Sequence, residues 1–112
     1  MTETEIAEFR RMIAARLEAL DREDRLGAAG QSTVTLDQQS VGRLSRMDAL
    51  QSQAMSRASQ ARRDAERRRL AAALGRMDEG EFGFCEECGE EIALPRLGLD
   101  PAATRCISCA HG

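Results

Sequence analysis

The chain has 112 residues, a formal net charge of −3, and aromatic side chains at only 3% of its positions. A chain of this length forms one small domain, and with three Phe, no Trp and no Tyr its core depends on aliphatic side chains and alanine. This composition favours helices packed on helices over a β-sandwich or an α/β sheet. No apolar run approaches the roughly 18 residues of a transmembrane helix, and the acidic N-terminus does not fit a signal peptide. We therefore expect a mostly α, cytoplasmic protein without membrane association.

The first predicted element is an amphipathic helix over about residues 3–26. Its apolar residues recur at spacings of three and four, which places them on one helix face. They are Ile6, Phe9, Ile13, Leu17 and Leu20. Gly27 and Gly30 predict the end of this helix. Because residues 27–37 lack periodicity, we expect them to form a loop at the tip of a helical hairpin.

A second, longer helix is predicted over about residues 37–79, because no proline interrupts this stretch and Asp37 suits a helix N-cap. Small and apolar residues recur along it with a period near that of a coiled coil, about 3.5 residues. The predicted seam consists of Leu44, Met47, Ala54, Ala58, Ala61, Ala65 and Ala72. Since the loop is short, the two helices should form an antiparallel coiled-coil hairpin over residues 1–79. A homodimeric coiled coil is the alternative that this seam leaves open; we expect a monomer.

All four cysteines lie in the segment 80–112, in the pattern C-x2-C-x17-C-x2-C. Two C-x2-C turns at such a separation are typical of a structural zinc site, in which four thiolates surround one ion. The expected ligands of a single Zn²⁺ are Cys85, Cys88, Cys106 and Cys109. Four protein ligands leave no position for a catalytic water, so the ion is expected to be structural. The segment between the pairs contains Pro95, Gly98 and Pro101, which predict turns, with room for one short β-hairpin, and no helix.

Disulfides, a thioredoxin-like redox pair and a rubredoxin-like iron site are alternatives for the same cysteines. No export signal supports disulfides, and no βαβ pattern supports a redox pair. His111 is the only histidine and lies next to the last residue, where little could orient it. No Ser/His/Asp or Cys/His constellation is present, so we do not expect an enzyme.

Bulky apolar residues gather where the long helix meets the cysteine-containing segment. They are Leu70, Leu74, Met77, Phe82 and Phe84, and we expect them to pack on the finger. The run ARRDAERRR over residues 61–69 lies on the long helix, and its acids partly offset its arginines. Such a run is more often a solvated face than a binding site.

The tract DEGEFGFCEECGEEIALPRLGLDPAATRCISC, preceded by a long helix and a helical hairpin, resembles the DksA/TraR family of bacterial regulators. The resemblance extends from Ile6 to Cys109. Its most specific part is the pattern G-x-F-G-x-C-x-x-C-G-x-x-I, which begins at Gly80, followed by the 17-residue gap and the pair C-I-x-C. It implies a transcription regulator that binds RNA polymerase and not promoter DNA, with its coiled-coil tip in the secondary channel. It also implies the alarmone ppGpp as a candidate second ligand, and the chain looks like a short form of the family.

The resemblance assigns roles to particular residues of this chain. Asp37 keeps the first acid of the family's tip motif D-x-x-D-x-A, whereas Ser40 and Gly42 stand at the positions of the second acid and the alanine. Asp48 is an alternative tip acid. The loss of the second acid predicts a weaker effect of the tip.

Basic positions of the family that meet polymerase or ppGpp fall on Arg62 and Arg69 of the long helix and Arg96 of the finger. Asp100, in contrast, stands where a basic phosphate contact is expected, and Ala110 replaces a lysine. A carboxylate repels a phosphate-bearing ligand, so the ppGpp site is expected to be weaker.

Two other functions compete with this interpretation: a nucleic-acid-binding zinc finger, and a sensor of thiol oxidation or zinc. Residues 81–112 carry two arginines against six acids and no stacking aromatic platform, which counts against nucleic-acid binding by the finger. Any site of four thiolates can lose zinc on oxidation, so sensing could accompany the first function.

Overall fold

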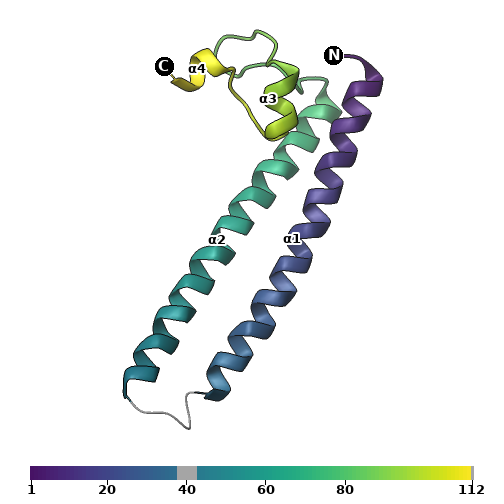
Figure 1. Cartoon of the computed structure of the whole chain (residues 1–112). Coiled ribbons are helices and arrows are strands. Elements are labelled where there is room, and N and C mark those ends of the chain that lie inside the picture. Colours follow the sequence, from purple (N-terminus) through teal and green to yellow (C-terminus); the bar gives the residue numbers. More distant parts are fainter. Residues whose placement is uncertain (38–42, 112) are drawn as a thin grey trace. The chain divides into compact units, whose positions relative to one another are not determined.

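The computed structural model describes the backbone of residues 1–37 and 43–111 and the side chains of residues 1–27 and 46–110. Four helices follow in chain order: α1 (Glu3–Asp37), α2 (Arg43–Glu79), α3 (Leu94–Leu99) and α4 (Ile107–His111) (Figure 1). The described residues contain no β-strand, only an isolated antiparallel bridge between Phe84 and Glu91. The mostly α fold class is therefore confirmed. None of the described helices is long and apolar enough to cross a membrane.

Helix α1 continues to Asp37, so the predictions of a helix end near residue 26 and of a loop over residues 27–37 are wrong. A glycine inside a helix costs only about 1 kcal/mol relative to alanine, and no proline lies in this stretch. A Cβ atom on Gly27 would lie 3.1 Å from Nη2 of Arg63, so the helix passes close to this side chain here. The second helix begins at Arg43 and not near residue 37.

Local hydrogen bonds fix the start of α1 and the end of α2. The Thr2 hydroxyl accepts a hydrogen bond from the Glu5 backbone N–H (3.2 Å), while Oε1 of Glu5 accepts one from the Thr2 N–H (2.9 Å). This reciprocal pair is a capping box. At the other end Gly80 adopts φ +75°, and the Glu81 N–H donates to the carbonyl of Arg76 (2.8 Å). That geometry is a Schellman motif, which ends α2 and turns the chain toward the cysteines.

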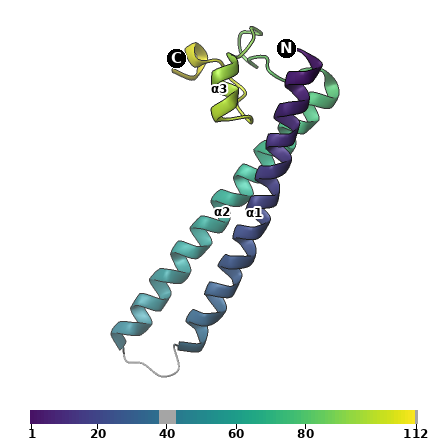
Figure 2. The ribbon, with the colours of Figure 1, turned by 45° about the vertical axis from the view of Figure 1, so that its right-hand side comes forward.

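The chain divides into two compact units, which are described separately. One unit comprises residues 1–17 and 68–112, and the other comprises residues 18–67. Both long helices contribute to each unit, and within each unit they lie side by side with opposite chain directions (Figures 1 and 2). The antiparallel hairpin is thus confirmed. The division does not follow the boundary near residue 80, because the finger shares its unit with residues from both long helices.

An apolar core stabilises the unit that contains the finger. Its buried residues are Phe9, Ile13, Leu70, Ala73, Met77, Phe82, Cys85, Ile92, Leu97, Ala102 and Ala103. The rings of Phe9 and Phe82 are tilted by 54° with centroids 5.7 Å apart, a favourable aromatic geometry. Phe84, which we expected to pack, is instead 45% exposed.

In the unit of residues 18–67, polar side chains join the two helices. Nε of Arg63 donates to Oδ1 of Asp24 (2.6 Å), and Nη2 of Arg67 donates to Oδ2 of the same carboxylate (2.5 Å). Nε2 of Gln60 also donates to Oδ1 of Asp24 (3.0 Å). The guanidinium of Arg63 is the main cause that holds the pKa of Asp24 below its ordinary value. We call Asp24, Gln60, Arg63 and Arg67 the ionic seam.

The seam predicted for α2 is therefore wrong: Ala54, Ala58 and Ala61 are exposed, and a different side of α2 faces α1. An alanine methyl buries little apolar area, whereas arginines in the contact gain charge-assisted hydrogen bonds and cover apolar surface with their stems. Leu20, which is fully buried, supplies apolar contact from α1 in this unit.

Candidate functional site

The first cysteine pair lies in a tight turn whose backbone hydrogen bonds follow from its sequence. The Cys85 N–H donates to the carbonyl of Glu90 (2.8 Å), and the Gly89 N–H donates to the carbonyl of Cys85 (2.9 Å). Gly89 has φ +76°, a left-handed conformation that glycine adopts without a steric penalty. The turn therefore reverses the chain within a few residues and brings Cys88 back toward Cys85.

The second pair is positioned by a helix start. Cys106 immediately precedes α4, and the Ala110 N–H donates to its carbonyl (2.9 Å). Cys109 lies inside this first turn. The Glu86 N–H donates to the carbonyl of Thr104 (2.8 Å), which ties the segment before the second pair to the turn of the first pair.

The four sulfurs form one cluster. All four Sγ atoms lie within 4.8 Å of one another, and the Sγ atoms of Cys88 and Cys106 are 3.8 Å apart. A zinc ion bound tetrahedrally through bonds of about 2.3 Å separates its sulfurs by about 3.8 Å, so the cluster has the dimensions of a zinc site with four thiolate ligands. All four thiols are free of disulfides.

The environment of the sulfurs also suits a divalent cation. Backbone N–H groups, first that of Cys88 and then that of Cys106, lower the pKa of the Cys85 thiol to about 6. The neighbouring sulfurs, first that of Cys106, raise the pKa of Cys109 well above its ordinary value. Backbone dipoles thus favour one thiolate while the sulfurs oppose further deprotonation. A bound zinc ion would remove this opposition, because its charge stabilises all four thiolates.

The segment between the cysteine pairs contains the helix α3 (Leu94–Leu99), so the prediction that it forms turns without a helix is wrong. Pro95 stands in the first turn, where a missing N–H group removes no helical hydrogen bond and a fixed φ suits the helix. Leu97 is fully buried and anchors this helix in the core of its unit. The burial of Leu97 is a tertiary contact that favours a helix here, and the turn-forming residues of the segment do not indicate it.

Two arginines that we predicted as contacts lie in the unit of the finger and have partners there. Nη2 of Arg69 donates to Oδ2 of Asp100 (2.8 Å), and both side chains are about half exposed. Nε of Arg96 donates to the carbonyl of Arg105 (2.9 Å). The charge at Asp100 is thus matched by a cation of the same chain. This ion pair was not predicted, although the sequence contained both residues.

The other predicted contact residues are distributed differently. Arg62 belongs to the unit of residues 18–67, where its Nη2 donates to the hydroxyl of Ser59 (3.0 Å). Asp37 is the last residue of α1, and Asp48 is an exposed residue of α2. Asp37 therefore ends one helix and is not the N-cap of the next. The side chain of Asp37, together with Ser40 and Gly42, lies outside the described residues.

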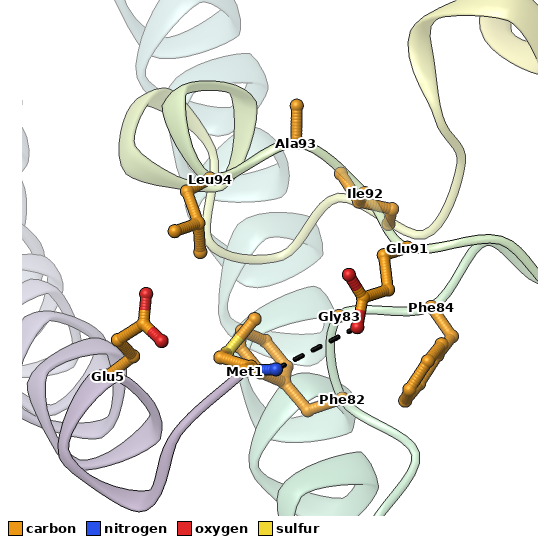
Figure 3. A pocket seen from close by; sticks show the side chains of 9 residues that line it. All are labelled: Met1, Glu5, Phe82, Gly83, Phe84, Glu91, Ile92, Ala93 and Leu94. Atoms are coloured by element: carbon orange, nitrogen blue, oxygen red, sulfur yellow. Dashed lines mark ion pairs between the residues drawn. The ribbon is translucent and has the colours of Figure 1, made fainter.

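A cavity of about 290 Å³ lies beside the finger and was not predicted (Figure 3). Its lining residues are Met1, Glu5, Phe82, Gly83, Phe84, Glu91, Ile92, Ala93 and Leu94. The N-terminal ammonium lies 3.8 Å from Oε1 of Glu91, and a Cβ atom on Gly83 would come within 2.6 Å of Cε of Met1. Because Gly83 has no Cβ atom, it leaves room for this methionine side chain, and its φ of +90° is a second reason for glycine at this position.

Comparison with known proteins agrees with this geometry. Residues 80–112 match the family described as the prokaryotic dksA/traR C4-type zinc finger. The finger thus carries a single structural zinc site, formed by the clustered cysteines.

Relatives extend the similarity beyond the finger. The RNA polymerase-binding transcription factor DksA of Escherichia coli is 30% identical over 113 residues, which cover 97% of this chain and 71% of that protein. The protein of the same name from Haemophilus influenzae is 44% identical over 50 residues, covering 42% of this chain and 34% of its own length. The structure of the transcription factor DksA2 from Pseudomonas aeruginosa matches with a TM-score of 0.85, at 22% identity, over 97% of this chain and 82% of that one. This likeness shows that the fold is shared.

Proposed function

Because the chain belongs to the DksA/TraR family, we propose that it is a transcription regulator that binds bacterial RNA polymerase. The observation that carries the proposal is the match over 97% of the chain to a relative named as an RNA polymerase-binding transcription factor. The helical hairpin and the cluster of four cysteines both lie within the matched length. On this proposal the protein acts in the cytoplasm, as a monomer and without catalysing a reaction itself.

The hairpin formed by α1 and α2 would enter the secondary channel of the polymerase. Helix α1 ends at Asp37 and α2 begins at Arg43, so the end of the hairpin that carries these two residues would be the leading tip. A carboxylate at the tip, which we assign to Asp37, could act on a Mg²⁺-dependent centre by changing the charge near the metal. Ser40 and Gly42 complete the proposed tip. The zinc ion would hold the finger folded as the base of the hairpin.

We expect ppGpp to contribute little to this function. Arg62, Arg69 and Arg96 are the candidate contacts for polymerase or the alarmone. Arg69 already pairs with Asp100 (2.8 Å), so a phosphate would have to displace a carboxylate and then lie beside it. Replacing Asp100 with asparagine removes this competitor, and ppGpp should then have a larger effect on transcription in vitro than it has with the wild type.

The first experiment is a titration of the labelled full-length protein with bacterial core RNA polymerase in the absence of DNA. Saturable binding in the micromolar range or tighter, prevented by a protein known to occupy the secondary channel, is the expected result. Absence of binding to polymerases from several bacteria would refute the proposal.

The assignment of the tip needs a separate test, because on this proposal only the tip changes initiation, whereas other parts of the protein also contribute to polymerase binding. Asp37→Asn should retain polymerase binding and lose the effect on initiation in vitro. Asp48→Asn is tested in parallel, because Asp48, an exposed carboxylate of α2, is the alternative tip acid. If Asp48→Asn abolished the effect and Asp37→Asn did not, Asp48 would be the tip acid.

A further inference from the structure

The side of α2 that faces away from α1 carries large apolar side chains in the unit of residues 18–67. Met47, Leu50 and Met55 are 63%, 62% and 66% exposed. At helical spacing, Met47, Leu50 and Ala54 share one face, which Ala58 continues for another turn and Met55 borders. We refer to these five residues as the Met–Leu patch. An exposed apolar patch with a polar border is characteristic of an interaction surface.

The ionic seam explains why this patch is free. Gln60 and Arg63 of α2 contact Asp24 of α1, so α2 turns polar side chains toward its neighbour. An isolated two-helix hairpin normally buries its apolar side in that contact. Here the apolar side stays available for another partner. Methionine also adapts its shape to the surface that it meets, which suits a binding surface.

The charged residues that border the patch indicate the charge of the partner that it fits. Arg46, Arg57 and Arg62 lie beside it, and Asp48 is the only acid between residues 46 and 63. Neither Arg46 nor Arg57 pairs with an acid of the described part of the chain, and Arg62 bonds only to the neutral Ser59 there. The border is therefore positively charged. A second copy of α2 would place arginines against arginines, which disfavours self-association through this face.

We propose that the Met–Leu patch is a docking surface for an acidic amphipathic helix of another protein. Such a helix would place leucine or alanine side chains on Met47, Leu50 and Ala54, and its glutamates or aspartates beside Arg57 and Arg62. This is the helix-in-groove mode of recognition, with charges that set the orientation. The proposal rests on the proposed function only in naming polymerase as the protein in which to look for this helix.

The first test uses the full-length protein and two synthetic helical peptides, so it does not depend on polymerase. Both peptides carry the same leucine–alanine heptads, with glutamates beside them in one and lysines in the other. The glutamate peptide should bind at least ten times more tightly than the lysine peptide, and Leu50→Gln should weaken its binding about tenfold. Equal binding of the two peptides, or no binding of the glutamate peptide, would overturn the proposal.

A control and a second partner separate this proposal from the proposed function. Arg22→Gln changes an exposed residue of α1 and should leave peptide binding unchanged. In the polymerase titration, Leu50→Gln and Arg57→Gln together should weaken binding at least tenfold, whereas Arg22→Gln should not. Wild-type-like polymerase binding by the double variant would exclude polymerase as the partner and leave the proposed function intact. Reversible dimerisation in sedimentation velocity that Leu50→Gln abolishes would show that a second copy covers the patch, and would overturn the proposal.

Discussion

The aromatic pair of Phe9 and Phe82 offers a quantitative test of how the finger is joined to the start of α1. The two side chains are 8% and 4% exposed, and their tilted rings lie 5.7 Å apart. Replacing either with leucine keeps most of the side-chain volume, so each single change should cost about 1–1.5 kcal/mol. A tilted ring pair contributes about 0.5–1.5 kcal/mol beyond its burial, and this contribution is lost with the first ring. The loss of stability in the double variant should therefore be smaller than the sum of the two single losses. The difference should be about 0.5–1.5 kcal/mol, the contribution of the ring pair.

The assay is urea unfolding of the wild type, both single variants and the double variant at one fixed concentration of free zinc. Zinc must be held constant because a ligand that binds only the folded state adds to the apparent stability. Circular dichroism follows the helices, and equal m-values in all four proteins are required before free energies are compared. Ile13→Val serves as a control for general loosening of the core, because Ile13 is fully buried and has no ring. Its cost should add to that of Phe82→Leu within about 0.5 kcal/mol if the two side chains share no partner.

Additive losses in the cycle of Phe9 and Phe82, within about 0.3 kcal/mol, would refute the reasoning. The two rings would then be independent apolar contacts, and the finger would be joined to α1 by burial alone. A coupling well above about 1.5 kcal/mol would also be informative. It would mean that the loss of one ring rearranges the segment around the other.

Three further predictions test the zinc site, the ionic seam and the backbone before the first cysteine. Cys88→Ser should abolish stoichiometric zinc binding, measured by metal analysis, and leave most of the helical circular dichroism; complete loss of helicity would show that the hairpin depends on the finger. Because the pKa of Asp24 is lowered in the folded state, its contribution is present above the ordinary aspartate pKa of about 4 and is lost as the pH falls through the lower folded value. Asp24→Asn should flatten this acid dependence of helicity, and an unchanged dependence would exclude Asp24 as its source. Gly83→Ala should destabilise slightly more than Gly89→Ala. Both glycines have positive φ, a conformation that costs an alanine about 1–2 kcal/mol, but only a Cβ atom on Gly83 meets other side chains, those of Met1 and Leu97. The additional loss should be smaller than the backbone cost because the end of the Met1 side chain can move; equal losses in thermal unfolding would contradict this reason.

The zinc site shows how much a short-range pattern can predict. The spacing of Cys85, Cys88, Cys106 and Cys109 determines that two turns can each present two thiolates to one ion, and the sulfurs do lie within 4.8 Å of one another. This prediction needed no knowledge of the core. The helix α3 within the same segment was missed, because its formation depends on the burial of Leu97, which turn-forming residues nearby do not reveal.

The helical hairpin was predictable as an architecture and not in its contacts. Periodicity of Phe9, Ile13 and Leu20 gave the buried face of α1 correctly, since large apolar side chains leave one energetically favourable orientation. The same reasoning failed for α2. The alanines followed a coiled-coil period, but their burial contributes little, and the pairing of Asp24 with Arg63 and Arg67 set the rotation of the helix instead.

By itself, the sequence determined the helical class, the antiparallel order of the two long helices and the metal centre, because each follows from spacing along the chain. Only the tertiary structure decided which side of α2 faces α1, where α1 ends, and that Arg69 is matched by Asp100. These features depend on residues far apart in sequence, whose charges and shapes meet only after folding. The exposure of the Met–Leu patch was also decided by the tertiary structure, because the polar ionic seam, and not the patch, forms the contact of α2 with α1.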